Sequence, residues 1–447
     1  MMTWANVTGK ATGIVASLVA VAVVSATGTP IPQPKLDALG LAVASDTQRR
    51  DLTLPPFTRP TQITNPLFPV STQASVLFTG TVNNKPFRTE VTLLPFTRIV
   101  SWNGIQVETL VSQYVAYLDS RVEEVAYDLY AQADDGSVWY FGEDVSDFRN
   151  GLIYTKEGTW LAGKDGPPAM IMPANPKVGD SFRAENMPGI AFEEVTVTAV
   201  DHVYDGPLGP IRGSMLGREL HADGSTDMKT FAPGYGEVFT GSGGDVEALA
   251  LAVPSDRLPG PVPADLTNLT TGALQIFVAA GQKQWDVAAN SAQQLEAAWN
   301  RYSKSRLPKS IQPILMQSLL DLSAAVKKRD SSAARQAAIH SARWSLDLQL
   351  RHRPVAEVDL ARFDLWAAQV LVDAAAKDYG AVNGDMFTLT LIRDRLLGSL
   401  HPDAAQNLNI LLGELMTATA EGKLVPARKA AENMRALVAL LQKRTTH

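Results

Sequence analysis

Hydrophobic and polar residues follow different patterns in the two halves of the chain. Between residues 74 and 253, short runs of alternating apolar and polar residues are separated by Gly, Pro, Asn and Asp. This pattern is typical of β-strands joined by turns. Beyond Asp265, long Ala- and Leu-rich stretches place apolar residues at helical spacing, as at Leu315 and Leu322. Four prolines lie in the intervening segment 253–265, which favours a stiff linker.

Two tight turns indicate that the strands pair as sequential antiparallel hairpins. Val82-Asn-Asn-Lys85 and Asp134-Asp-Gly-Ser137 each lie between alternating runs. Asn and Gly accept the positive φ that a short hairpin turn requires. Sequential antiparallel pairing favours a curved sheet or half-barrel, because a parallel sheet would need crossover helices. Such a sheet often encloses a cavity that binds a small molecule or a lipid, but alternation alone does not separate a cavity from a packed core.

The second half predicts about eight helices arranged as a repeated antiparallel hairpin. The second helix of each hairpin is expected to begin about 46 residues after the previous one, near Ala288, Ala334, Ala381 and Ala427. Hairpins of this kind stack as a solenoid or close into a bundle, and both arrangements offer grooves for a protein partner. His340 and Asp347 share one helix face and are expected to pair in a salt-bridged packing layer.

These patterns predict an α+β fold with two domains, a curved antiparallel β-sheet or half-barrel followed by an all-α helical-hairpin bundle or solenoid. The expected boundaries are a signal peptide over 1–26, a disordered spacer over 27–60, the antiparallel β domain over 61–253, a Pro-rich linker over 254–264 and the helical domain over 265–447.

The N-terminal segment indicates export. Lys10 precedes the apolar run Ile14–Val24 and the small residues Ser25-Ala-Thr27, which together are typical of a secretory signal peptide. An uncleaved membrane anchor is the alternative, because the uncharged stretch 11–34 exceeds the ~18 residues of a spanning segment. Membrane contact is expected only in that case. Both alternatives place the protein in the periplasm, the cell envelope or the extracellular space.

Charge and cysteine content narrow the class of protein. The chain has no Cys, which excludes a disulfide scaffold and a thiol enzyme. From Asp265 to His447 there are 22 Lys and Arg against 17 Asp and Glu, whereas residues 11–264 hold 17 against 29. An acidic first domain disfavours nucleic acid and either attracts cationic ligands or docks on the basic helical domain. Ordinary solvated surfaces are the simpler interpretation.

Three segments of the first domain resemble an uncharacterised family of exported bacterial β-rich proteins. They are Tyr130–Asp144, Met170–Arg183 and Phe231–Val238, and the resemblance covers roughly residues 60–250. Tyr235 departs from the apolar β-branched residue usual in related sequences. The resemblance implies a fold and an export route, but no reaction and no cofactor.

The candidate ligand-binding residues surround one predicted hairpin. Glu143 and Asp144 lie near the Asp134–Ser137 turn and beside Trp139 and Tyr140. Such a group suits paired carboxylates or an oxygen-rich cation site. The alternative is that turns collect Asp and Gly for backbone reasons.

A metal site is a weaker hypothesis. Met170, Met172 and His221 offer the soft ligands that cuprous ion prefers, although core Met residues at this spacing are common. Glu219 shares a strand face with His221, but two ligands do not define a zinc site.

The leading interpretation is an exported cell-envelope binding protein without a cofactor. Its β domain would bind a small apolar or cationic ligand and its helical domain would contact a partner. No Gly-x-Ser-x-Gly or phosphate-loop signature occurs, which favours a non-enzymatic role. The alternatives are a carboxylate-dependent hydrolase or carbohydrate-active enzyme using Glu143 and Asp144, and a periplasmic copper carrier.

Overall fold

The computed structural model describes residues 29–30 and 40–444, so the expected signal peptide over 1–26 lies outside the described residues. The described chain is an antiparallel sheet followed by eight helices, which confirms the predicted α+β class. It divides into two compact units. The β unit ends at Ser255 and excludes 121–123 and 148–153, which group with the helical unit from Asp256 onward.

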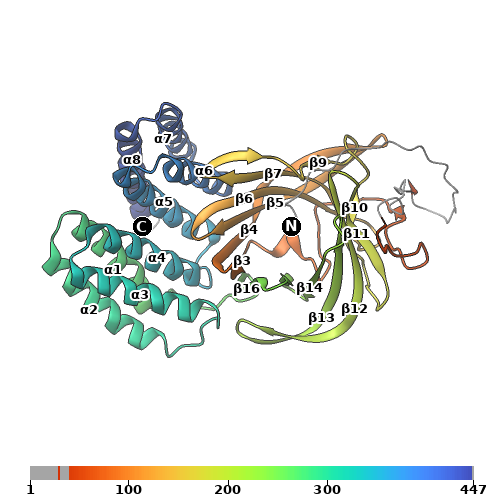
Figure 1. Ribbon diagram of the computed structural model, residues 1–447, viewed down its shortest axis with the longest axis horizontal. Helices are drawn as coiled ribbons and strands as arrows, with labels where there is room; N and C mark the ends of the chain where they lie inside the picture. The colour runs from red at the N-terminus through yellow and green to blue at the C-terminus, as the bar shows by residue number, and fades with distance from the viewer. Residues whose placement is uncertain (1–28, 31–39, 445–447) are drawn as a thin grey trace. The chain divides into compact units, whose positions relative to one another are not determined.

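The main sheet of the β unit is antiparallel, in the order β10-β7-β6-β5-β4-β3-β16-β15-β14-β13-β12-β11, with β8 and β9 paired to β7 (Figure 1). A separate pair joins β1 to β2. The strands are β1 Thr29–Pro30, β2 Thr53–Leu54, β3 Ser75–Val82, β4 Lys85–Trp102, β5 Ile105–Leu118, β6 Arg121–Gln132, β7 Val138–Arg149, β8 Leu152–Thr155, β9 Trp160–Leu161, β10 Ala169–Met172, β11 Ser181–Met187, β12 Ala191–Gly206, β13 Gly209–His221, β14 Thr226–Ala232, β15 Gly236–Ser242 and β16 Asp245–Val253.

The sheet is two sequential meanders joined edge to edge. Strands β3 to β7 form one meander and β11 to β16 the other, and β16 returns to pair with β3 from Val246↔Thr81 to Val253↔Ser75. The outer strands β10 and β11 also contact each other, so the sheet curves until its two edges meet. Asn83 and Asn84 adopt φ of 51° and 59° between β3 and β4, as the expected tight turn requires.

On part of this sheet, the usual alternation of buried apolar and exposed polar residues is reversed. On β14, the side chains of Asp227 and Lys229 are 2% and 1% exposed, whereas Met228 between them is 40% exposed. Successive side chains point to opposite faces of a strand. The inner face of the curved sheet therefore carries charged groups here, and an apolar core elsewhere around Trp139, Trp160 and other buried residues.

The prediction of a disordered spacer up to residue 60 is wrong for its described part. Arg49 and Asp51 are buried and paired with each other. Arg50 Nε donates to Asp180 Oδ1 over 2.7 Å, and the Ser181 amide donates to the Gln48 carbonyl over 2.8 Å. The charges of Arg49, Arg50 and Asp51 are thus neutralised by partners, and these contacts fix the segment beside β11.

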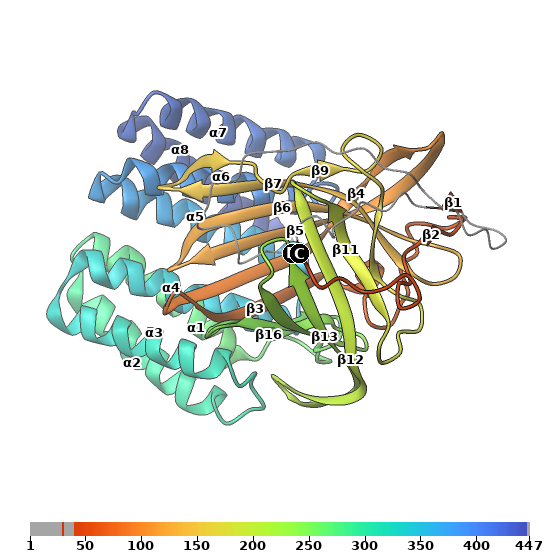
Figure 2. The ribbon, with the colours of Figure 1, turned by 45° about the vertical axis from the view of Figure 1, so that its right-hand side comes forward.

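The helical unit consists of two four-helix bundles in sequence (Figure 2). In the first, α1 contacts α2 and α4, and α3 contacts α2 and α4; α5 to α8 repeat this closed ring, and α4 contacts α5. The helices are α1 Ala264–Gly281, α2 Trp285–Tyr302, α3 Ile311–Lys328, α4 Ser331–Gln349, α5 Val355–Ala376, α6 Tyr379–Arg395, α7 Pro402–Ala420 and α8 Leu424–Arg444.

The predicted hairpin repeat follows from small residues at equivalent positions. The four alanines expected near the start of each second helix lie within α2, α4, α6 and α8 and are all buried, which lets paired helices approach closely; they are Ala288, Ala334, Ala381 and Ala427.

One predicted pair is corrected. The ring of His340 hydrogen-bonds Gln336, whereas buried Asp347 accepts from Arg362 over 2.6 Å. Arg362 also donates to Asp359 over 2.9 Å. The salt-bridged layer exists, but its cation is Arg362 and not His340, because a guanidinium bonds two carboxylates at once.

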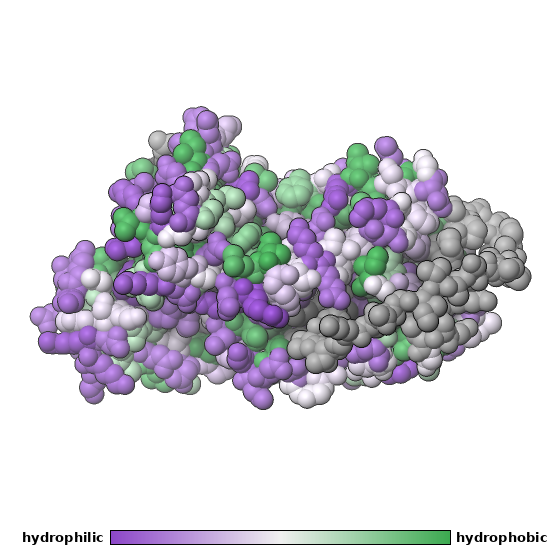
Figure 3. All heavy atoms as spheres, turned by 45° about the horizontal axis from the view of Figure 1, so that its top comes forward, coloured by the Kyte–Doolittle hydropathy of each residue, from purple (hydrophilic) through white to green (hydrophobic). Residues whose placement is uncertain are grey.

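On the face drawn in Figure 3, hydrophilic residues predominate and hydrophobic ones occur singly or in small groups. Among the described residues, no helix is long and apolar enough to cross a membrane.

Candidate functional site

A cavity of about 80 Å³ lies within the β unit, against the inner face of the curved sheet. Strands β3 to β6 and β14 to β16 contribute to its wall, together with the segment 68–73. The apolar residues of the wall include Phe68, Val70, Val76, Phe78, Val91 and Leu93. The polar ones include Ser112, Tyr114, Asp128, Tyr130, Lys229, Glu237, Thr240 and Glu247.

Asp128 belongs to the cavity wall and lies beside two tyrosine rings. The Tyr140 hydroxyl donates to Asp128 Oδ1 over 2.7 Å. The rings of Tyr130 and Tyr140 stack with centroids 4.8 Å apart. Burial raises the pKa of Asp128, while the tyrosine hydrogen bonds oppose that shift. Asp128 and Tyr130 therefore present a carboxyl group and an aromatic ring to the cavity.

Glu237 and Glu247 are the other carboxyl groups in the wall. Glu247 accepts a hydrogen bond from the Thr89 hydroxyl, and Glu237 accepts one from the Thr240 hydroxyl. Burial raises the pKa of Glu247 to about 7. Burial also raises the pKa of Glu237, against the opposing effect of Lys229. Glu247 is thus poised to change charge near neutral pH.

Lys229 is the one basic residue among those that line the cavity. Its Nζ atom lies 3.0 Å from Glu219 Oε2 and 3.9 Å from Glu237 Oε2. Burial lowers the pKa of Lys229, but Glu219, Glu237 and Glu193 outweigh burial and leave it well above its ordinary value. The ammonium group therefore stays charged and occupied by its carboxylate partners.

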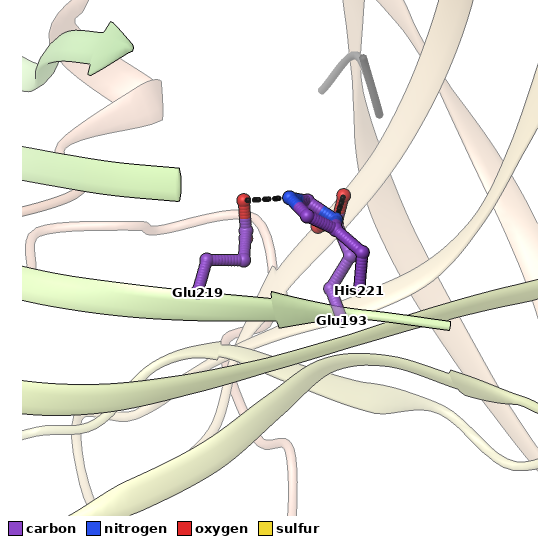
Figure 4. A group of neighbouring side chains, drawn as sticks. All are labelled: Glu193, Glu219 and His221. Carbon is purple, nitrogen blue, oxygen red and sulfur yellow. Dashed lines mark ion pairs between the residues drawn. The ribbon is translucent and has the colours of Figure 1, made fainter. Parts of the chain in front are cut away.

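A second cluster of titratable groups surrounds His221 at the end of β13 (Figure 4). Its Nδ1 atom lies 3.9 Å from Glu193 Oε1, and its Nε2 atom lies 3.8 Å from Glu219 Oε2 and 3.3 Å from Asp227 Oδ2. Burial lowers the pKa of His221, but these carboxylates outweigh burial and raise it. Burial raises the pKa of Glu219 to about 7.

The predicted ligand residues separate onto the two faces of β7. A register shift in the pairing of β6 with β7 falls between Asp128 and Tyr130, opposite Gly142 with its φ of 134°. Such a shift brings Tyr140 and Glu143, three residues apart, to the same face. Asp144 follows on the opposite face, where it is exposed and lies 2.7 Å from Arg98. Glu143 and Asp144 therefore do not act as a pair.

Glu143 instead pairs with Glu185 of β11. Both are buried, and burial is the main cause that raises the pKa of each. A hydrogen bond between the two carboxyl groups lowers the pKa of Glu143 and raises that of Glu185 further. Each carboxyl group therefore affects the ionisation of the other. Neither belongs to the residues that line the cavity.

The remaining predicted residues have structural partners. Trp139 is fully buried and donates from Nε1 to Ser137 Oγ over 2.8 Å. In the adjoining turn, Asp134 accepts from Thr58 and Asp135 accepts from Ser137. The backbone interpretation of these turn carboxylates is thus supported by their local hydrogen bonds.

Met170 and Met172 lie on β10 within the apolar core, where they pair with Trp139 and Val138 across β7. His221 lies on β13 among carboxylates. The surroundings of His221 are therefore those of a hard or borderline cation and not of cuprous ion.

Sequence reasoning missed the inward-facing charges of β12 to β16. Asp227 lies directly opposite Glu219, and Glu193 directly opposite His221. The turn Ala222-Asp-Gly-Ser225 between the runs was the available signal, because a tight turn there sets the register of β13 and β14.

No family model matches the chain, and no curated protein matches it. The resemblance over residues 60–250 therefore stays a prediction. The geometry of the site carries the functional argument.

Proposed function

We propose that the β domain is a binding module whose cavity takes a small organic cation with an apolar body. The observation that carries the proposal is the composition of the wall, which combines the carboxyl groups of Asp128, Glu237 and Glu247 with apolar side chains. Lys229 supplies the only ammonium group in the wall, and this group is already paired with Glu219, which lies outside the wall. The cavity thus has an excess of carboxyl groups that a ligand cation can neutralise.

The shape and the aromatic groups support the same class of ligand. At about 80 Å³ the cavity is smaller than drug-sized pockets, which range from roughly 300 to 1,000 Å³. A ligand of a few heavy atoms fits such a space. Tyr114 and Tyr130 place aromatic rings in the wall, and ring faces attract alkylammonium groups. A short primary amine in its protonated form meets these requirements.

Calorimetric titration with n-propylammonium tests this proposal, with n-propanol as the neutral ligand of similar size. We expect the full-length protein to bind the cation and not the alcohol. Glu247→Gln should weaken binding by roughly tenfold or more, because a charged hydrogen bond contributes about 1.5–3 kcal/mol. Glu157→Gln alters an exposed carboxylate and should leave binding unchanged. Equal affinity for cation and alcohol would remove the proposal.

We also propose that the protein acts outside the cytoplasm and that the helical domain contacts a partner. The apolar run Ile14–Val24 before Ser25-Ala-Thr27 supports export. Exposed apolar side chains on α7 and α8, such as Ile410 and Val425, support a protein contact. N-terminal sequencing of protein recovered from its own cells tests the first part, and cross-linking through the helical surface tests the second.

A hydrolase is the second candidate function. The observation in its favour is the buried pair Glu143 and Glu185, whose pKa values are both raised and influence each other, as those of acid–base carboxyl groups do. Glu143→Gln should abolish any hydrolytic activity while preserving the fold. Activity that survives this substitution would exclude the pair as its source.

A further inference from the structure

His221 and the three carboxyl residues around it occupy one face of three adjacent strands. Glu219 and His221 are two residues apart on β13, so their side chains lie on the same face. Glu193 on β12 is the direct partner of His221, and Asp227 on β14 is the direct partner of Glu219. Directly opposed residues have Cβ atoms about 4.5–5.5 Å apart. The register therefore brings three carboxylates around one imidazole.

Several polar atoms of this cluster are buried without a hydrogen bond. Both ring nitrogens of His221, Glu193 Oε1, Asp227 Oδ2 and Glu219 Oε1 lack a hydrogen-bond partner among the described residues. The side chains of all four residues are at most 3% exposed. Leaving such groups unsatisfied in a protein interior costs free energy. A cation that binds some of these atoms lowers this cost.

Two distances from His221 Nε2 are close to the spacing of ligands around a metal ion. The Nε2 atom of His221 lies 3.3 Å from Asp227 Oδ2 and 3.8 Å from Glu219 Oε2, beyond ordinary hydrogen-bond length. Two atoms bound at about 2.1 Å from a tetrahedral metal lie about 3.4 Å apart. One ligand atom each from Glu193, Glu219 and His221 also lies within 4.8 Å of the others.

Charge points in the same direction. Glu193, Glu219, Asp227 and nearby Glu237 are four carboxylates, and Lys229 is the ammonium group that contacts them. A metal-binding imidazole is neutral, so with all four carboxyl groups ionised the cluster carries three negative charges in excess. A divalent cation lowers that excess to one.

We propose that His221 Nε2, Glu219 and Asp227 bind a divalent first-row metal ion, with Zn²⁺ as the reference cation. Imidazole with carboxylates suits zinc and its neighbours better than cuprous ion. Glu193 faces the other ring nitrogen, Nδ1, at 3.9 Å. It is a positioning residue whose carboxylate lies on the Nδ1 side of the ring, where carboxylates orient metal-bound imidazoles. This site is distinct from the proposed amine cavity.

Equilibrium dialysis of chelator-treated full-length protein against micromolar ZnCl2 tests the site. We expect one Zn²⁺ per chain and a raised midpoint of thermal unfolding. His221→Ala and Asp227→Asn should abolish this binding, whereas Glu193→Gln should weaken it by about 10- to 100-fold. His202→Ala removes an exposed histidine from β12 and is the matched control.

The opposing interpretation is an imidazolium ion paired with the three carboxylates. Long-range ¹H–¹⁵N correlation of the His221 ring distinguishes the two. Loss of the Nε2 proton on addition of one equivalent of Zn²⁺ supports the metal site. A ring that keeps both protons with Zn²⁺ present overturns the proposal, as does Zn²⁺ binding that persists in His221→Ala.

Discussion

The Lys229 ammonium lies 3.0 Å from Glu219 Oε2, and each side chain is 1% exposed. Lys229 lines the cavity, whereas Glu219 faces the His221 ring. This ion pair therefore connects the two proposed cation sites. Because a buried charge is costly unless paired, a substitution at either residue should alter cation binding at both sites.

Removing the ammonium group tests the first consequence. Lys229→Met leaves Glu219 buried without its cation, so we expect the β domain to lose about 3–5 kcal/mol of unfolding free energy. Hydrogen-exchange mass spectrometry of β13 and β14 peptides measures this loss separately from the helical domain.

The double variant Lys229→Met with Glu219→Gln is the matched control. It removes both charges, so we expect most of the lost stability to return. A loss below about 1 kcal/mol in the single variant would show that the pair is not the electrostatic anchor of this face.

Two buried glutamates should make the β domain more stable in mild acid than in mild base. Burial raises the pKa of Glu247 to about 7 and that of Glu124 to about 8, from an ordinary value of 4.5. Between pH 4.5 and these raised pKa values, the folded state therefore binds more protons than the unfolded state. The stabilisation is complete below pH 4.5 and is lost as pH rises through 7 and 8. We expect a decrease of several kcal/mol between pH 5 and pH 8.

Glu247→Gln should flatten this pH dependence, since the shift of Glu247 corresponds to about 3 kcal/mol. Glu157→Gln, at an exposed position, should leave the slope unchanged. Hydrogen exchange corrected for the intrinsic rate at each pH provides the measurement. Stability that rises from pH 5 to pH 8 would contradict this account of the interior.

Glu185 should titrate at lower pH when Glu143 is neutral. In Glu143→Gln the burial of Glu185 remains, but the repulsion from the Glu143 carboxylate is gone. We expect the pKa of Glu185 to fall while staying above 4.5. Carboxyl ¹³C chemical shifts followed across pH measure this directly. An unchanged pKa would mean that the two carboxyl groups are not coupled.

The helical domain offers a contrast between buried and exposed ion pairs. Arg362→Leu removes the guanidinium that the buried Asp347 and Asp359 share, although Arg395 stays 3.8 Å from Asp359, so we expect a loss of about 3–5 kcal/mol. Arg301→Leu breaks the pair with Asp265, in which Arg301 is 59% exposed, and should cost at most about 1 kcal/mol. Hydrogen exchange in α4 and α2 reports the two losses. Equal losses would contradict the burial argument.

The fold was predictable because local patterns and tertiary structure agree. Asn83 and Asn84 form the tight turn that their residue types favour, and the alanines of the hairpin repeat are buried as helical spacing requires. The register shift near Gly142 is different. It depends on pairing with β6 and β9, and it brings Tyr140 and Glu143 to the same face, which no local pattern reveals.

The candidate site was less predictable, because its residues violate the expectation that inward positions are apolar. Asp227 and Lys229 alternate with Met228 as a surface strand would, yet the charged side chains are the buried ones. His221 was singled out from sequence, but its partner Glu193 lies on another strand. Only the register of β12 with β13 brings the two together.

The affinity for n-propylammonium at pH 6 and pH 8, measured calorimetrically at constant ionic strength, tests the central claim most directly. Because the pKa of Glu247 is about 7, its carboxylate population rises across this interval, and we expect binding to tighten by about tenfold. The same increase should be absent in Glu247→Gln. Affinity that is equal or weaker at pH 8 in the unaltered protein would contradict a cation site in this cavity.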